Sequence, residues 1–188
     1  FSWLNFMPES IVVGIANVDR KRDFSFASSD ALDQKEFPTS GGSEAFIQFV
    51  KTEVQPLINK RYKTSGLDTL IGQSLGGLLA SQILIESPEM FDNYIIISPS
   101  LWWDKESLLA KEVNTDQQNL NVYVGVGAEG TSMVRLATSL ADKLTRAYKG
   151  KNVVNFGYFE KLNHGDTLHL AAYDALKTVF AKADEDAK

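Results

Sequence analysis

Short apolar runs alternate with longer amphipathic stretches along most of this chain. Runs rich in β-branched and aromatic residues predict strands at 10–15, 67–73, 94–98, 120–126 and 153–159. Between and after them, apolar residues recur at the helical period and predict helices at 43–62, 75–85, 133–144 and 167–182, with a shorter one at 105–112. Strands that alternate with helices form a parallel sheet with helices on both faces. The pattern therefore predicts a single α/β domain over residues 1–188.

The first part of the chain departs from this regular pattern. After Ser10, residues 11–15 form a continuous apolar run rich in β-branched residues, so 10–15 is predicted to be a strand buried on both faces. From Asn17 to Gly42 the sequence is polar and rich in Ser and Asp, and it predicts a long loop of functional importance. Pro56 is expected to kink or restart the helix at 43–62, because it has no N–H. The chain opens without an initiator Met or a leading strand, so we expect the domain to be N-terminally incomplete.

Residues 69–80, TLIGQSLGGLLA, read as a strand, a sharp turn and a helix. The turn carries Gly72-x-Ser74-x-Gly76, which is the pattern of a nucleophile elbow. On such a turn the serine hydroxyl stands clear of the backbone, and side chains at the two glycines would collide with the crossing strand and helix. The free N–H groups of the following helix point at the serine. We predict that Ser74 is a nucleophile, with a structural Gly/Ser turn as the alternative.

A serine hydroxyl is a weak nucleophile and needs an adjacent base, for which histidine is suited at neutral pH. The chain has two histidines. His164 lies in a loop between the last strand and the last helix, whereas His169 falls inside that helix. A histidine within a helix more often has a packing role. We therefore predict His164 as the base, and the alternative is that His164 only caps the helix.

The base needs an acid that orients it. Glu129 is the first candidate because it directly follows the penultimate strand, where the nucleophile–acid–base order of an α/β-hydrolase requires an acid. Asp104 is the second candidate, Asp166 follows the histidine, and a Ser–His dyad without an acid stays open. The N–H of Leu75 is the predicted oxyanion donor. The second donor would come from a loop that this sequence does not contain.

Composition excludes several classes of function. The chain has 24 acidic and 19 basic residues, a net charge of −5 and no basic run, which argues against nucleic-acid binding. It has no cysteine, so thiolate catalysis and disulfides are excluded, and two histidines do not favour a metal site. We expect no metal and no cofactor. A membrane-spanning helix needs about 18 consecutive apolar residues, and this sequence shows no such run. We therefore expect a soluble protein of the cytoplasm or periplasm. The sequence carries no signal for an oligomeric state.

These motifs resemble the esterase branch of the α/β-hydrolase superfamily, close to siderophore (enterobactin-type) esterases. The resemblance covers nearly the whole chain, and its serine and tryptophan motifs are the most specific. It is carried by VVGI at 12–15, DRKRD at 19–23, SGG at 40–42, GQSLGG at 72–77, SPSLWW at 98–103 and NHG at 163–165. It implies an α/β-hydrolase fold and a serine hydrolase of carboxylic esters, with Ser74 as nucleophile and His164 as base. Some similar proteins lack a clear triad acid.

The substrate is expected to be a small-molecule ester, such as a siderophore, aryl or acyl ester. Trp102 and Trp103 are candidate walls of an acyl or aromatic pocket, although one of them could instead pack under the short helix. Arg22 is a candidate partner for an anionic or catecholate group. We expect hydrolysis through an acyl-serine intermediate. The alternatives are an acyltransferase or thioester hydrolase at the same site, or a non-catalytic binding domain on a hydrolase scaffold.

Overall fold

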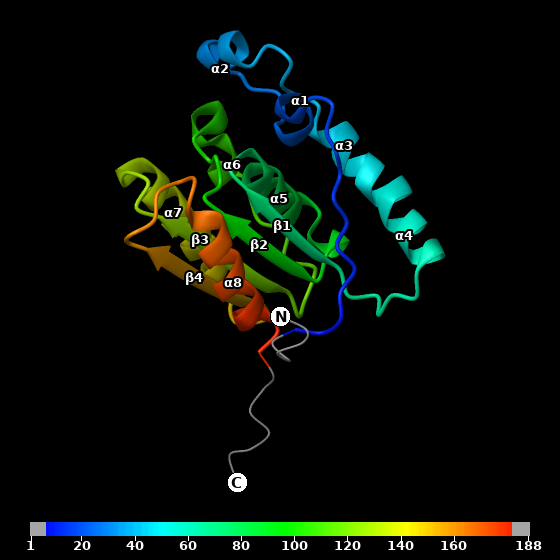
Figure 1. Ribbon diagram of the computed structural model, residues 1–188. Helices are drawn as coiled ribbons and strands as arrows, with labels where there is room; N and C mark the ends of the chain where they lie inside the picture. Colours follow the sequence, from blue (N-terminus) through cyan, green and yellow to red (C-terminus); the bar gives the residue numbers. More distant parts are fainter. Residues whose placement is uncertain (1–6, 182–188) are drawn as a thin grey trace.

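A four-stranded parallel sheet lies at the centre of the computed structural model, which describes residues 7–181 (Figure 1). The strands are β1 (Thr69–Gln73), β2 (Asn93–Ile97), β3 (Asn121–Gly127) and β4 (Val153–Phe159). They pair in the order β1-β2-β3-β4, and each pair is parallel. Their carboxyl ends therefore meet at one edge of the sheet, as the alternating sequence pattern predicted. The α/β prediction is confirmed.

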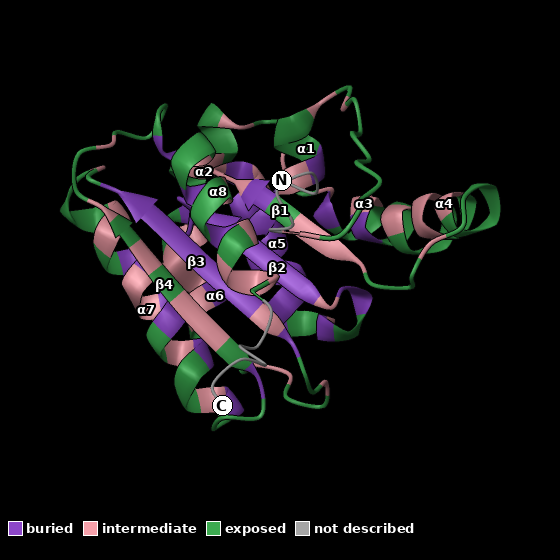
Figure 2. Ribbon diagram, turned by 60° about the horizontal axis from the view of Figure 1, so that its bottom comes forward, coloured by how far each residue is buried: buried purple, intermediate pink, exposed green. Residues whose placement is uncertain are grey.

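Helices cover both faces of the sheet. One core joins alternate residues of β2 and β3 to α5 (Leu75–Glu86) and α7 (Thr131–Tyr148). The opposite residues of the same strands, which include Ile95 and Tyr123, pack on Ala171 and Ala175 of α8 (Thr167–Val179). Both faces of β2 and β3 are thus covered, and every residue of β2 is buried (Figure 2). This explains why these strands read as continuous apolar runs in the sequence.

The predicted strand at 10–15 is wrong. Residues 11–17 form no regular structure, and Val12 is 92% exposed. The segment runs beside the β1 edge (Figure 1), but it joins no ladder with β1. An apolar run becomes a buried strand only when neighbours take its backbone hydrogen bonds and cover both of its faces. The described chain supplies neither, and Ile71 on the adjacent strand is also exposed.

The polar segment from Asn17 to Gly42 is not loop throughout. It contains two short helices, α1 (Arg20–Phe24) and α2 (Ala31–Glu36). The carboxylate of Asp19 accepts from two backbone N–H groups of α1, and that of Asp30 accepts from the N–H of Leu32 in α2. Aspartates at these positions are preferred N-caps, so the two helices follow from capping rather than from an apolar stripe.

The helical prediction for 43–62 is confirmed, with a local change of pitch. The segment runs as α3 (Ser43–Phe49), a π-helical turn η2 (Val50–Val54) and α4 (Gln55–Arg61). Pro56 stands in the first turn of α4, directly after the wider turn. A proline lacks the N–H that would close a regular α-helical turn, and a π-turn is one way to accommodate it.

The short helix predicted at 105–112 is present but shorter than predicted. A 3₁₀ turn η4 (Trp103–Glu106) leads into α6 (Ser107–Ala110), and a further 3₁₀ turn η3 (Pro88–Met90) precedes β2. Asp104, Lys105 and Glu106 all have positive φ, in the left-handed region. Side-chain contacts to the α2 segment hold this turn, and they cannot be read from helical periodicity.

The crossing of β1 and α5 explains the glycines around Ser74. A Cβ on Gly72 would lie 2.2 Å from the carbonyl oxygen of Gly76, and one on Gly77 would lie 3.0 Å from Pro99 Cα. A Cβ on Gly76 itself would meet nothing nearer than the Phe24 ring at 3.9 Å. The expected collision is therefore real at Gly72 and absent at Gly76. The second close approach lies at Gly77, where α5 passes the end of β2.

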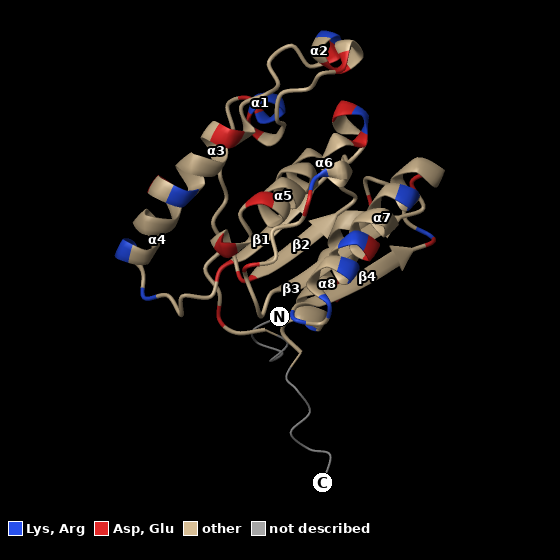
Figure 3. Cartoon of the chain, turned by 180° about the vertical axis from the view of Figure 1, so that it is seen from behind, with Lys and Arg blue, Asp and Glu red and all other residues tan. Residues whose placement is uncertain are grey.

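Charged side chains are spread over the helices and loops rather than gathered on one face. Both signs of charge appear at scattered positions on the helices and loops (Figure 3). Within residues 7–181, no helix is both long and apolar enough to cross a lipid bilayer.

We predict that Gly72→Ala destabilises the fold by about 2 kcal/mol or more, because the new methyl group would overlap backbone atoms that cannot move independently. Gly76→Ala is the matched control. We expect its free energy of unfolding to exceed that of the wild type by no more than about 1 kcal/mol. The reason is that alanine loses less backbone entropy than glycine when a helix forms. Urea denaturation measures both. Equal losses in the two variants would contradict the assigned packing.

Candidate active site

Ser74 occupies the sharp turn between β1 and α5. Its backbone has φ 58° and ψ −119°, an unusual conformation for a residue with a side chain. The turn is held from β2, because Ser74 N–H donates to the Ile97 carbonyl at 3.1 Å and Ser100 N–H donates to the Ser74 carbonyl at 3.1 Å. The Ser74 and Ser100 hydroxyl oxygens lie 3.4 Å apart. Strain and anchoring together present the Ser74 hydroxyl at the carboxyl end of the sheet.

The N–H of Leu75 lies at the start of α5, directly after Ser74. Leu75 is the first residue of α5, so its N–H has no partner inside the helix. It donates to no other group in the described part of the chain. The first N–H groups of a helix also carry its partial positive charge. This donor can therefore stabilise negative charge that develops next to the Ser74 hydroxyl.

His164 and Glu129 come together although 35 residues separate them. The Nδ1 atom of His164 lies 2.5 Å from Oε2 of Glu129. The Glu129 side chain is 2% exposed and that of His164 is 47% exposed, so the pair reaches from the interior to the surface. When Nδ1–H donates to the carboxylate, Nε2 is left as the basic nitrogen. The sequence ranked Glu129 first among the acids, and the structure joins it to His164.

The other carboxylate oxygen of Glu129 is held by three donors. Oε1 accepts from the Ser98 hydroxyl at 2.5 Å, the Gly127 N–H at 3.0 Å and the Thr167 hydroxyl at 3.1 Å. Burial raises the pKa of Glu129, but the hydrogen bonds from Ser98, His164 and Gly127 outweigh burial and hold the pKa below its ordinary value. Glu129 is thus ionised at neutral pH and fixed in direction.

The two rival acids are engaged elsewhere. Asp104 accepts hydrogen bonds from Ser28, Ser29 and Ser107. Burial opposes ionisation of Asp104, yet these bonds lower its pKa to about 2. Asp166 accepts from the Asn163 side chain at 2.6 Å. Within residues 7–181, neither carboxylate forms a hydrogen bond or an ion pair with the His164 ring.

The loop that carries His164 is also tied to β1. The Gln73 side chain donates to the His164 carbonyl at 3.0 Å, so the residue just before Ser74 holds the backbone of the histidine. Among the described residues, no hydrogen bond joins the Ser74 hydroxyl to the His164 ring. Sequence reasoning assigned no role to Gln73, Ser98 or Thr167. Ser98 lies within the quoted tryptophan motif, but nothing in the motif says where its hydroxyl points.

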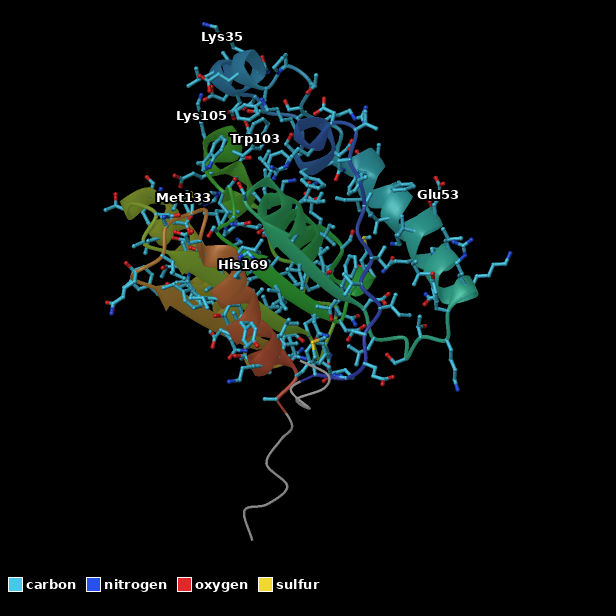
Figure 4. All side chains as sticks on the ribbon, in the orientation of Figure 1. Lys35, Glu53, Trp103, Lys105, Met133 and His169 are labelled. Atoms are coloured by element: carbon cyan, nitrogen blue, oxygen red, sulfur yellow. The ribbon has the colours of Figure 1, made fainter. Side chains whose placement is uncertain are left out.

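The two tryptophans of the motif have different surroundings. Trp103 is buried and donates its indole N–H to the Phe26 carbonyl at 2.9 Å, near α2 and α6 (Figure 4). Trp102 is 39% exposed and packs beside Phe37, with ring centroids 6.0 Å apart. The Lys21 ammonium lies 4.8 Å from the centre of the Phe37 ring. Trp102 thus contributes an open aromatic surface two residues after Ser100.

Arg22 forms an ion pair rather than reaching the serine. Its Nε donates to Asp23 at 2.8 Å, and Asp23 also accepts from Asn17. Within the described residues, Arg22 forms no hydrogen bond or ion pair with Ser74 or Trp102. His169 projects from α8 and is exposed (Figure 4). No group of three or more His, Asp or Glu residues between 7 and 181 is arranged to hold a metal ion.

Known proteins are similar to this chain in sequence and in architecture. The model of the Esterase family, described as "putative esterase", matches residues 5–166. Ferri-bacillibactin esterase BesA of Bacillus subtilis is 32% identical over 120 residues, which are 57% of this chain and 42% of the relative. The siderophore triacetylfusarinine C esterase of Aspergillus fumigatus is 37% identical over 87 residues, which are 41% of this chain and 30% of the relative.

Solved structures give the same picture of the fold. The crystal structure of the BES protein from Bacillus cereus matches with a TM-score of 0.76 and 32% identity, over 85% of this chain and 63% of that chain. An IroE-like serine hydrolase from Shewanella oneidensis matches with a TM-score of 0.82 over 93% of this chain and 61% of that chain. At 24% identity, this second likeness shows the fold alone. The chain spans less than two thirds of these relatives.

We predict that ionised Glu129 stabilises the fold at neutral pH. Its pKa in the folded chain lies below the ordinary value of 4.5, so the unfolded chain binds a proton more readily. The stabilisation is complete above that ordinary value and is lost as the pH falls through the lower folded pKa. Glu129→Gln should therefore lower the free energy of unfolding by about 1–3 kcal/mol at pH 7, and by progressively less in acid.

Urea denaturation between pH 7 and pH 3 measures this difference. Glu112→Gln, at an exposed glutamate, is the matched control and should stay close to the wild type at each pH. A Glu129→Gln deficit that did not shrink in acid would contradict the assigned ionisation.

Proposed function

The chain belongs to the Esterase family, and from this premise we propose that it is a serine hydrolase that cleaves carboxylic esters through an acyl-serine intermediate. The observation that carries the proposal is the buried Glu129 carboxylate bonded to His164 beside the strained turn at Ser74. A nucleophile, a base and an orienting acid are the groups that acyl transfer through serine requires.

In the proposed acylation step, the Ser74 hydroxyl attacks the ester carbonyl while Nε2 of His164 takes its proton. The carbonyl π electrons move to oxygen, and the Leu75 N–H donates to that oxyanion. When the tetrahedral intermediate collapses, the ester C–O bond breaks. The alcohol leaves with the proton from His164, and the acyl group remains on Ser74. Glu129 stays ionised and stabilises the imidazolium throughout.

Deacylation repeats these steps with water as the nucleophile. His164 takes a proton from the water, which attacks the acyl-serine carbonyl, and Ser74 leaves with the proton from His164. The carboxylic acid is released and the enzyme is regenerated. Proton transfer needs the imidazole within hydrogen-bond reach of Ser74, and such contacts often form only with substrate bound. The bond from Gln73 to the His164 carbonyl supports the proposal, because it ties the backbone of the histidine to the residue before Ser74.

For the substrate class, we propose a small ester with an aromatic or siderophore-like acyl group. The names of two relatives describe them as esterases of siderophores. In this chain, the half-exposed Trp102 and its neighbour Phe37 offer flat apolar surface close to Ser100. Arg22 is proposed as a counter-charge for an anionic ring substituent, because its guanidinium uses only Nε in its bond to Asp23.

We predict that a fluorophosphonate probe labels Ser74 alone, and that Ser74→Ala abolishes both labelling and ester hydrolysis. His164→Ala should lower kcat by about 10³-fold or more, since the base is lost. His169→Ala is the matched control and should retain wild-type rates, because His169 is an exposed residue of α8. Hydrolysis of p-nitrophenyl butyrate measures the rates.

If the well-folded protein is not labelled by the fluorophosphonate, the proposed hydrolase activity is contradicted and a non-catalytic binding domain is favoured. Product analysis with a competing alcohol or thioester tests the acyltransferase and thioester alternatives. Transfer of the acyl group to the alcohol in place of water would overturn the assignment of water as the acceptor.

We predict that Trp102→Ala raises KM for aryl esters by about 3- to 10-fold, because the lost aromatic contact contributes about 1 kcal/mol. KM for short alkyl esters should change much less. Tyr62→Ala removes an exposed aromatic side chain at the end of α4 and serves as the control. An equal change in KM for aryl and alkyl esters would argue against an aromatic subsite at Trp102.

A further inference from the structure

Ser98 is a fully buried residue whose backbone is strained and whose hydroxyl is aimed at Glu129. Its φ of 46° lies in the left-handed region, although it has a side chain. Its side chain donates to Glu129 Oε1 at 2.5 Å, and its own N–H donates to the Gly125 carbonyl at 2.7 Å. Strain of this kind persists only where the surrounding structure over-determines it. Ser98 is therefore held by β3 while its hydroxyl holds the residue that follows β3.

The other donors to Glu129 cannot replace Ser98. The Thr167 hydroxyl has one proton, and it lies 2.7 Å from the Asn163 carbonyl as well as 3.1 Å from Glu129. The Gly127 N–H lies 3.0 Å from Oε1 of Glu129. The Gly127 backbone is tightly packed and cannot shift toward the carboxylate, because even a Cβ at this position would overlap Thr167 and the Leu162 carbonyl. Of the three, only the Ser98 hydroxyl gives Oε1 an undivided hydroxyl proton at short range.

The two residues after Ser98 contact the nucleophile turn. Pro99 packs against Gly77 at the start of α5, and the Ser100 N–H donates to the Ser74 carbonyl. The Ser98–Ser100 segment thus touches the acid at one end and the serine at the other. A shift of this segment would change the distance between the two ends of the proposed triad.

We propose that Ser98 is a positioning residue that locks Oε1 of Glu129, so that Oε2 faces His164 and the acid stays in register with Ser74. This inference rests on the proposed serine hydrolase function. Ser98 touches no reacting atom and acts only through Glu129. His164 is the titratable side chain that contacts Glu129 among the described residues; the other side chains around the carboxylate, Ser98 and Thr167, are neutral hydroxyls.

The test uses Ser98→Gly and Ser98→Ala in the full chain. Both remove the hydroxyl, but glycine also relaxes the positive φ and should keep the fold at least as stable as alanine does. Ser81→Ala is the control, because Ser81 is equally buried and its hydroxyl bonds to the Gly77 carbonyl within α5. With p-nitrophenyl butyrate, we expect both Ser98 variants to lose roughly 10- to 100-fold in kcat. KM should stay within about 2-fold of wild type, because Ser98 acts on the proposed triad and not on the substrate.

A second readout follows Glu129 without any substrate. The ¹³C carboxyl resonance of Glu129, assigned by its loss in Glu129→Gln, reports the titration of that group. The pKa of Glu129 should rise in both Ser98 variants, because a donor that stabilises the charged form is gone. Ser81→Ala should leave both kcat and the titration unchanged.

The outcomes separate this inference from the proposed function. Wild-type kcat and an unmoved Glu129 titration in Ser98→Gly would overturn the positioning role. A fall in kcat that tracks melting temperature, with an unmoved titration, would also overturn it, because the loss would then be structural. If the wild type neither hydrolyses esters nor reacts with the fluorophosphonate, the proposed function fails. The titration of Glu129 in the Ser98 variants then still decides whether Ser98 fixes the carboxylate.

Discussion

The close crossing of β1 and α5 is the constraint on which the candidate site depends. Gly72 leaves no space for a side chain beside the Gly76 carbonyl, and Gly77 passes close to the end of β2, though less tightly. The chain can reverse between strand and helix only if the residue between them takes a positive φ, and that residue is Ser74. The same turn points the first N–H groups of α5 at the serine. Packing therefore explains both the strain at Ser74 and the position of the helical N–H groups that the proposed mechanism uses for the oxyanion.

A buried carboxylate is the second organising element. A charge removed from water must be compensated by hydrogen bonds and a partner charge. Glu129 has four such neighbours, contributed by the ends of β2 and β3, the His164 loop and the start of α8. These elements are distant in sequence, so the carboxylate fixes their relative positions while they fix its direction. Fold stability and site geometry are coupled at this residue.

The edges of the sheet differ from its centre. β2 and β3 are covered on both faces, whereas Ile71 of β1 is exposed. The neighbouring segment at 11–17 is mostly exposed to solvent. This is where periodicity misled the strand prediction. An apolar run reports that a segment would be stable when covered, and it carries no information about whether a neighbour is present to cover it. The helices α1 and α2 were missed for the opposite reason, because capping aspartates and not apolar stripes define them.

The sequence by itself determined the parallel α/β architecture, the long helices and the elbow pattern around Ser74. These follow from local periodicity and glycine spacing, which short segments encode on their own. It also favoured His164 over His169 as the proposed base, and it ranked Glu129 first among three acids. Only the tertiary structure joined Glu129 to His164, occupied Asp104 with other partners and brought Ser98 and Gln73 to the site. Those contacts depend on loop conformations and strand order across many residues, and a hydroxyl or amide in a sequence does not record the direction in which it will point.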